Sequence, residues 1–357
     1  MKRTAATLVA TAGLLAGSVG QASATGSWTE EPVPTSAQSG MLTAAGSAQG
    51  ESWAFGYTSN GGSPMDETSA VYRKGEQSWQ QVPIENVGPL VDGTVIAPDH
   101  VWTISLPPKG GPGTSAHWDG QKWTRVDLAA QPGKYPQPLA MKAFAPDDIW
   151  TVGRTWATRG MAQHWDGKAW TDVPVPQIDD RLYSLNDVEG VASNDLWAVG
   201  QTTPASRNVA LHWDGKAWTE VPAPDVNGDP GVPEGLNNVL ALAPDDVWVG
   251  GYSGEQGHEV PYTAHWDGKA WEAFELDESG KISQFVRVGD QIQLFGVGPN
   301  LEPFWLGWRD GQWQGKLAPP MVRVYGAVVQ DDGAILGVGN RTGEGAAMEP
   351  YTATYHE

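Results

Sequence analysis

The stretch PDDIWTVG at residues 146–153, followed by HWDGKAW at residues 164–170, decides the fold of this chain because both motifs recur along it. The first motif has seven copies of varying strength, around Trp53 and Trp102 and at residues 146–153, 193–200, 244–250, 293–296 and 335–339. A short motif repeated at regular intervals indicates a repeat architecture.

The second motif, His-Trp-Asp-Gly-x-x-Trp, alternates with the first. Four full copies and two diverged ones lie at residues 117–123, 164–170, 212–218 and 265–271, and at 72–79 and 307–313. The seventh copy is split, since residues 351–357 resemble the strand entering the turn and residues 26–30 the strand leaving it. The last Trp recurs every 42 to 53 residues, which is typical of propeller blades. We therefore predict an all-β, seven-bladed β-propeller of four-stranded antiparallel blades, closed by pairing the N-terminal strand with the C-terminal strands.

One repeat shows the strands of a blade. Four β-leaning runs separated by turn residues lie at 185–192, 196–201, 209–213 and 218–221. Of the 19 Trp, 17 occupy repeat positions, and we interpret them as core between blades. Only Trp156 and Trp305 lie outside the repeat.

The first 24 residues have the pattern of a secretory signal. A basic start, Met1 to Arg3, precedes a short apolar run at 4–20 and an Ala-Ser-Ala cleavage site at 22–24. An N-terminal anchor helix is the weaker interpretation, because the run is short and rich in Gly and Ser. We expect the propeller to span 25–357, to be secreted and extracellular, and not to insert into a membrane.

Composition excludes several functions. With 22 Lys+Arg against 42 Asp+Glu, the formal net charge of −20 leaves no basic surface for nucleic acid. The absence of Cys excludes disulfides, thiolate metal sites and cysteine nucleophiles.

The two faces of the disc are expected to differ. If the strands of a blade are named a to d from the centre outward, the short repeated a–b and c–d turns share one face, which we call the turn face. The b–c and d–a loops, which vary in length and chemistry, share the other, the loop face. Variable loops on a rigid scaffold commonly carry function.

The repeat resembles known propeller families. Trp-Asp-Gly-x-x-Trp is similar to the outer strands of the kelch repeat and to the Asp-box turn of bacterial sialidases. The kelch double glycine is mostly missing, and Asp166 adjoins Gly167 where an Asp-box separates the two residues. The chain most resembles secreted bacterial propellers built from this same repeat, which implies a fold and no particular activity.

Candidate ligand-binding residues lie in the loops. Arg154, Arg159, Arg181 and Arg207 cluster in the loops of the third and fourth blades, with Trp156 and Tyr183 near them. Arginine pairs with carboxylates in a bidentate manner, as it does in sialidases, and an adjacent aromatic ring suits a sugar or a peptide. The alternative is a set of solvated arginines that offset local acids. A second, weaker group in the fifth blade comprises Tyr252, Glu255 and His258.

We expect no metal and no cofactor. The repeated His residues, His117, His164, His212 and His265, occupy equivalent places in successive blades, so we expect each to bond a nearby turn carboxylate or carbonyl. The acid pairs at 147–148 and 245–246 suggest Asx-type turns. Residues 225–229 have the acid spacing of a calcium loop, but Pro230 stands where an EF-hand needs Gly and no Glu follows at the twelfth position.

The function that we infer is a secreted, monomeric, non-enzymatic module that binds a glycan or an extracellular protein or peptide through the loop face. An extracellular carbohydrate-active hydrolase or lyase using the same arginines is the alternative, and a purely structural role is the third.

Overall fold

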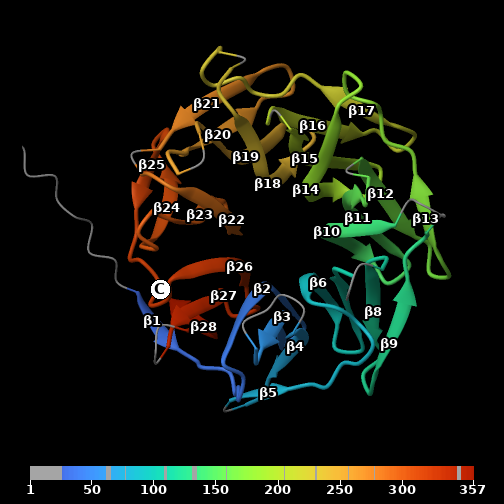
Figure 1. Cartoon of the computed structure of the whole chain (residues 1–357). Helices are drawn as coiled ribbons and strands as arrows, with labels where there is room; N and C mark the ends of the chain where they lie inside the picture. Colours follow the sequence, from blue (N-terminus) through green and yellow to red (C-terminus); the bar gives the residue numbers. More distant parts are fainter. Residues whose placement is uncertain are drawn as a thin grey trace, which may run out of the picture.

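The protein is a ring of seven four-stranded sheets. The computed structural model describes residues 26–61, 66–76, 78–107, 111–130, 135–157, 159–204, 206–229, 231–255, 257–276, 278–343 and 347–357. The predicted leader at 1–24 lies outside them. The regular elements of the described part are strands, β1 to β28, and their sheets are arranged in a ring (Figure 1). The predicted antiparallel seven-bladed propeller is confirmed.

In blades 1 to 6 the strands pair in chain order from the centre of the ring to the rim, and in blade 7 β26, β27 and β28 are followed at the rim by β1. Blades 1 to 3 contain β2 (Ser39–Ala48), β3 (Glu51–Ser59), β4 (Glu67–Lys74) and β5 (Trp79–Gln81); β6 (Leu90–Ala97), β7 (His100–Ser105), β8 (Thr114–Trp118) and β9 (Trp123–Asp127); and β10 (Pro136–Ala145), β11 (Asp148–Thr155), β12 (Gly160–Trp165) and β13 (Trp170–Val173). Blades 4 and 5 contain β14 (Leu182–Ala192), β15 (Asp195–Thr203), β16 (Asn208–Trp213) and β17 (Trp218–Val221), and β18 (Glu234–Ala243), β19 (Asp246–Ser253), β20 (Val260–Trp266) and β21 (Trp271–Glu275). Blade 6 contains β22 (Lys281–Val288), β23 (Gln291–Val297), β24 (Pro303–Arg309) and β25 (Gln312–Gly315), and blade 7 contains β26 (Arg323–Val329), β27 (Ile335–Thr342), β28 (Met348–His356) and β1 (Ser27–Glu30).

Blade 7 closes the ring with both ends of the chain. β1 pairs antiparallel with β28, and Trp28 lies opposite Tyr355 (Figure 1). The Trp28 ring packs 5.4 Å from the rings of Trp305 and Tyr355, and its indole N–H donates to the Leu317 carbonyl. The predicted closure is confirmed. Trp305, which lies outside the repeat, is 1% exposed and is a core residue of this joint.

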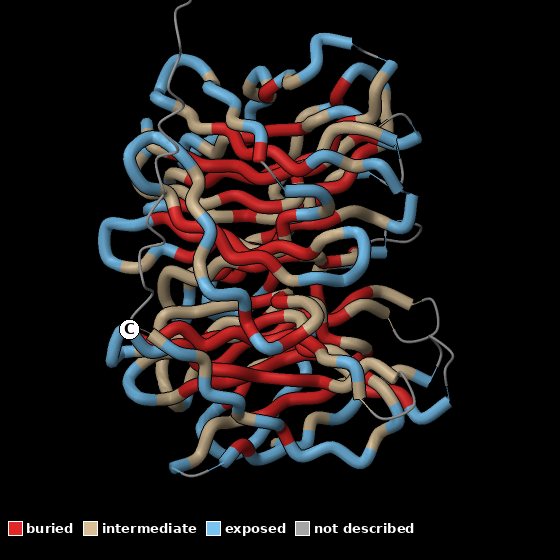
Figure 2. The backbone as a smooth tube through the Cα atoms, turned by 90° about the vertical axis from the view of Figure 1, so that its left-hand side faces the viewer, coloured by how far each residue is buried: buried red, intermediate tan, exposed pale blue. Residues whose placement is uncertain are grey.

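Tryptophan packs between blades, as the repeat predicts. The Trp150 ring of blade 3 lies 5.1 Å from Trp213 and 6.0 Å from Trp218 of blade 4. The same trio recurs where Trp102 meets Trp165 and Trp170. Buried backbone therefore runs through the strands, and exposed backbone gathers in the connections (Figure 2).

Candidate functional site

The turn face is held together by its own acidic residues. The Asp166 carboxylate accepts the backbone N–H groups of Lys168 and Ala169 at 2.9 Å each. The next residue, Gly167, has φ +85°, a left-handed conformation that favours glycine. The same turn is built on Asp119, Asp214 and Asp267. These backbone N–H donors lower the pKa of all four carboxyls, so the turns act as scaffold.

Three of the four repeated histidines bond a carboxylate of the a–b turn. Nε2 of His164 lies 2.8 Å from Oδ1 of Asp148, and the equivalent pairs are His212 with Asp195 and His265 with Asp246, both at 2.9 Å. The structural role expected for these histidines is confirmed. The Asx-turn interpretation of the acid pairs is wrong for Asp148 and Asp246, because each pairs with the histidine of strand c.

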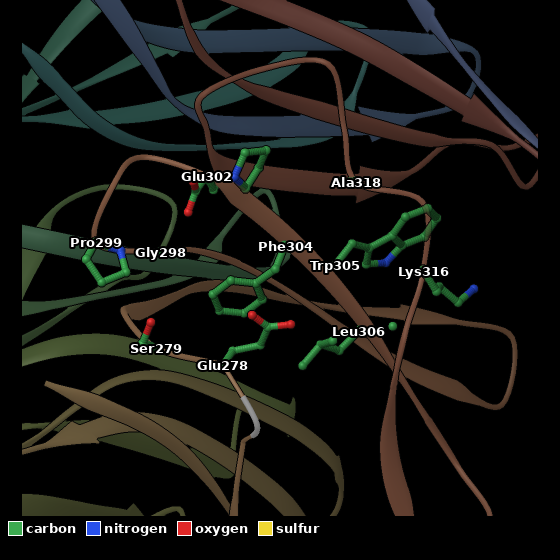
Figure 3. A pocket seen from close by; sticks show the side chains of 12 residues that line it. Glu278, Ser279, Gly298, Pro299, Glu302, Phe304, Trp305, Leu306, Lys316 and Ala318 are labelled. Carbon is green, nitrogen blue, oxygen red and sulfur yellow. The ribbon is translucent and has the colours of Figure 1, made fainter. Parts of the chain in front are cut away.

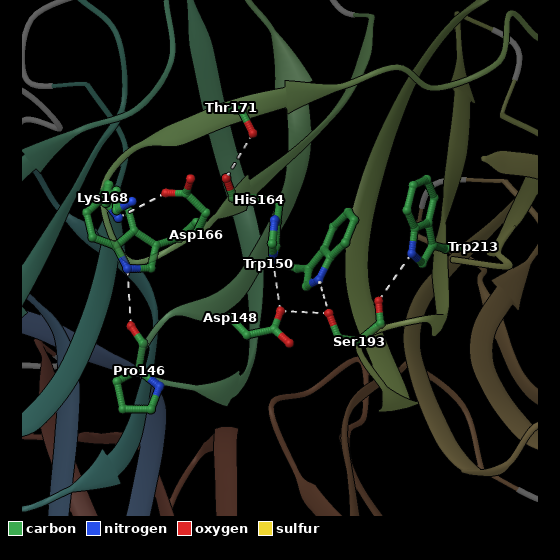
Figure 4. A network of polar contacts seen from close by, with 10 residues as sticks. Pro146, Asp148, Trp150, His164, Asp166, Lys168, Thr171, Ser193 and Trp213 are labelled. Atoms are coloured by element: carbon green, nitrogen blue, oxygen red, sulfur yellow. Dashed lines mark hydrogen bonds and ion pairs between the residues drawn. The ribbon is translucent and has the colours of Figure 1, made fainter. Parts of the chain in front are cut away.

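A polar network links blade 3 to blade 4 on this face (Figure 4). Asp148 also accepts a 2.7 Å bond from the Ser193 hydroxyl of the next blade. That hydroxyl accepts the indole N–H of Trp150 at 3.2 Å. Asp148 is therefore satisfied by two blades at once.

An exposed aromatic pair marks the loop face of blade 3. Trp156 is 58% exposed, and its backbone N–H donates to the carbonyl of Tyr135, which is 40% exposed. Arg154 precedes this ring and donates from Nε to Gln137, while Arg159 is exposed on the same b–c loop. The Thr155 N–H donates to the Arg159 carbonyl at 2.7 Å and fixes that loop. Arg154 therefore lies near the end of β11, and Trp156 and Arg159 follow in the b–c loop.

Tyr183 is a core residue rather than a surface aromatic. Its ring is 3% exposed, and its hydroxyl donates to the Pro176 carbonyl at 2.6 Å. A Cβ placed on Gly160 would lie 2.1 Å from the ring, so the two residues are in direct contact. This burial corrects the interpretation of Tyr183 as a ligand-contacting residue. Through this contact, Gly160, which follows Arg159, lies against β14, which begins directly after Arg181.

The other predicted residues lie in different surroundings. Arg207 lines a cavity of about 210 Å³ together with Asp225, Asp229 and Glu234. The Tyr252 hydroxyl donates to Gln201 at 3.1 Å, and Lys281 lies 5.7 Å above its ring. His258 is exposed, and its backbone N–H donates to Glu255. No contact in the described part of the chain joins these three residues to Trp156.

The four predicted arginines differ from two other arginines of the described structure in their surroundings. Among the described residues, no carboxylate lies within 4.0 Å of Arg154, Arg159, Arg181 or Arg207, whereas Arg73 and Arg125 are paired with Glu51 and Asp127. Direct pairing with local acids therefore does not account for these arginines.

The loop at residues 225–229 uses its polar side chains internally. Asp225 accepts the N–H of Gly228, and Asp229 accepts that of Gly231, both at 2.8 Å. Asn227 donates to Glu234 and to Ser253. Across the described ranges, no group of three or more His, Asp or Glu residues is arranged to hold a metal ion.

The innermost strands of two blades carry acidic residues that the repeat did not reveal. Each inner strand has a bulge against its neighbour, and Asp92 and Asp187 follow the bulges of β6 and β14. Asp92 accepts the N–H of Met141 at 2.8 Å, and Asp187 accepts that of Val239 at 2.9 Å, each from the next blade. Burial raises the pKa of both carboxyls to about 7, and the nearby Glu189 adds to the rise. Both carboxyls therefore link the inner strands of neighbouring blades by hydrogen bonds.

Comparison with known proteins shows the fold. No protein-family model and no curated protein matches the chain. Solved structures do: YCF48 bound to D1 peptide has a TM-score of 0.62 and 15% identity, and covers 92% of this chain and 97% of that one. The WD40 β-propeller domain of Doa1 has a TM-score of 0.60, 9% identity and the same coverage. An Aleuria aurantia lectin in complex with α-methyl-L-fucoside has a TM-score of 0.50 and 13% identity, over 82% of this chain and 97% of that one.

No described helix is long and apolar enough to span a membrane. The chain is a seven-bladed β-propeller similar in fold to proteins solved with a peptide or a fucoside bound.

Proposed function

We propose that the chain is a secreted, non-enzymatic binding module that recognises a glycan through the b–c loop of blade 3. The observation that carries the proposal is Trp156, a large ring left 58% exposed beside Arg154 and Arg159, which lack carboxylate partners in the described part of the chain. Burying such a side chain stabilises a protein by about 1.5–3 kcal/mol, so its exposure favours a ligand that covers it.

The chemistry of the loop favours one class of ligand. The Trp156 and Tyr135 rings offer apolar faces with polar edges, which suit the C–H face of a sugar. The two guanidinium groups offer paired donors to a carboxylate. We therefore propose an acidic glycan, one that carries a uronate or another carboxylated sugar.

The comparisons support a binding role in general terms. Two of the propellers similar in fold were solved with a fucoside and with a peptide. The secretory pattern of residues 1–24 supports an extracellular ligand.

A glycan array tests the proposal. Residues 25–357 are applied to neutral and carboxylated glycans, and we expect retention on carboxylated ones. Trp156→Ala and Arg159→Ala should each weaken a hit at least tenfold. Arg309→Ala is the matched control, because Arg309 is exposed at the c–d turn of blade 6 on the opposite face.

The other outcomes are informative. Equal losses in the Arg159 and Arg309 variants would place the binding face elsewhere. Retention of peptides without any glycan would indicate a protein ligand. A shortened glycan recovered after incubation would favour a hydrolase or lyase.

A further inference from the structure

The outer edge of blade 6 carries two adjoining cavities. One measures about 360 Å³ and lies beside β21, and the other measures about 250 Å³ and lies beside the b–c loop of blade 6 (Figure 3). Both are lined by Glu278, Leu306 and Gly315, so they form one continuous groove along β24 and β25. We call it the rim groove. It is separate from the Trp156 loop on blade 3.

The rim groove has aromatic walls. Phe274, Trp308 and Trp313 line the larger cavity, and all three rings are partly exposed. The Phe274 and Trp308 rings lie 4.8 Å apart. Phe274 stands where blades 3 and 4 have Val173 and Val221, so this wall is particular to this part of the ring.

The indole N–H of Trp308 differs in its hydrogen bonding from the equivalent groups of blades 3 and 4. In blades 3 and 4 the equivalent indoles, Trp165 and Trp213, donate to carbonyls of the a–b turns, whereas in blade 2 the buried N–H of Trp118 has no partner among the described residues. Within the described residues, the indole N–H of Trp308 has no hydrogen-bond partner. That donor is available to a carbonyl of a bound chain.

The c–d turn of blade 6 has the same length as in the repeat but a different conformation. Trp308 pairs with Trp313 and Arg309 with Gln312, leaving a two-residue turn in which Asp310 and Gly311 have φ of 51° and 76°. In blade 4 the pairing ends at Trp213 and Trp218, and of the four residues between them only Gly215 has a positive φ, of 84°. Gly311, without a side chain, forms one end of the groove.

The charge of the rim groove is negative. Glu275, Glu278 and Glu302 line it, and none of them has a basic side chain within 4.0 Å in the described part of the chain. A ligand ammonium or guanidinium group here would be stabilised by the aromatic face, through a cation–π interaction, and by the carboxylate, through charge-assisted hydrogen bonds.

One cation lies at the far end of the groove. The Lys316 side chain is 13% exposed, and its Nζ lies 4.7 Å from the Trp305 ring centroid and 4.0 Å from Oε1 of Glu357. In Figure 3 its amino group points away from Phe304 and Glu278. Lys316 therefore belongs to the ring closure, and a ligand cation would lie at the Glu275–Glu278 end.

We propose that the rim groove binds an extended basic peptide, with an arginine or lysine side chain between Trp308 and the Glu275 and Glu278 carboxylates. The indole donor serves a peptide carbonyl, and the two cavities accommodate successive side chains.

The test uses an octapeptide with arginine at alternate positions, measured by calorimetry against residues 25–357 at about 0.15 M salt. The triple variant Glu275→Gln, Glu278→Gln, Glu302→Gln should bind at least tenfold more weakly. A control triple, Glu85→Gln, Glu272→Gln, Asp290→Asn, changes the charge equally at exposed positions outside the groove and should stay within about twofold. Glu272 lies on the same strand as Glu275.

Trp308→Phe keeps an aromatic ring and removes the N–H, and we expect about threefold weaker binding. Trp156→Ala should leave peptide binding unchanged, which separates this site from the glycan site. Equal losses in the two triple variants would show attraction to net charge alone and would overturn the proposal. So would failure of the wild-type chain to bind the peptide at millimolar concentration.

Discussion

The two faces of the disc treat their charged side chains differently. On the turn face, Asp148 accepts bonds from His164 and Ser193, and Asp166 accepts two backbone N–H groups. On the loop face, Arg154 and Arg159 have no carboxylate partner among the described residues, and Trp156 lies largely exposed. The repeated His–Asp pairs of blades 3 to 5 are satisfied within the blade or by its neighbour, whereas these unrepeated arginines remain available to a ligand.

The largest effect should come from breaking the scaffold at its noncovalent joint. Deleting residues 25–34 removes β1 and exposes the edge of β28, so we expect a sharp fall in melting temperature and aggregation. Calorimetry checks this, with an unrelated N-terminal extension on residues 25–357 as the control. A truncated chain that melts like the intact one would contradict the closed ring.

A pair of Trp substitutions compares the faces directly. Trp150→Ala removes a buried ring between blades and should cost about 3–5 kcal/mol of unfolding free energy. Trp156→Ala should stay within about 0.5 kcal/mol, as for a surface change. Denaturant unfolding measures both. A similar cost at the two positions would mean that Trp156 contributes to the core.

The repeat made the fold predictable, since its strands, turns and closure follow from motifs that occur in successive blades. The exposure of Trp156 and the lack of acidic partners at the four arginines could not be read from the sequence, because they depend on loop conformation.

Two kinds of residue were misjudged or missed. Tyr183 follows a loop in the sequence, yet the glycine at position 160 lets the neighbouring blade cover its ring. Asp92 and Asp187 lie at bulges of the inner strands, where the sequence does not repeat and no motif draws attention to them. Similarly, Phe274 and Trp308 fit the strand pattern, and the turn conformation and the cavity are what distinguish blade 6.

Asp92 and Asp187 on the innermost strands lead to a prediction about how stability depends on pH. Because the folded-state pKa values of Asp92 and Asp187 are raised to about 7, the unfolded chain loses these protons first as pH rises. Their contribution is therefore fully present below about pH 4 and is lost as pH approaches and passes 7. Melting temperatures from pH 4.5 to 8 should show a decline that is smaller in Asp92→Asn, Asp187→Asn. An unchanged profile in this variant would assign the decline to other groups.

The smallest change in stability should come from restoring the His–Asp pair that blade 2 lacks on the turn face. In blade 2, His100 stands where blade 3 has Asp148, and Nε2 of His117 is buried without a partner in the described structure. Burial lowers the pKa of His117, and the nearby His100 lowers it further. Stability from this group is therefore present above its unfolded pKa and lost as pH falls.

His100→Asp should supply the missing carboxylate in the geometry of the 2.8 Å His164–Asp148 pair. We expect stabilisation of about 0.5–1.5 kcal/mol, typical of one hydrogen bond. The lost contact between His100 and Asp99 is exposed and contributes little. The new carboxylate should raise the pKa of His117, so the advantage over the parent should grow from pH 7 to pH 5. Unfolding across that range, with His117 followed by NMR titration, measures both effects. If the stability gained by the variant shrank as pH fell, the new carboxylate would not be pairing with His117. The turn of blade 2 would then differ from those of blades 3 to 5 in more than this residue.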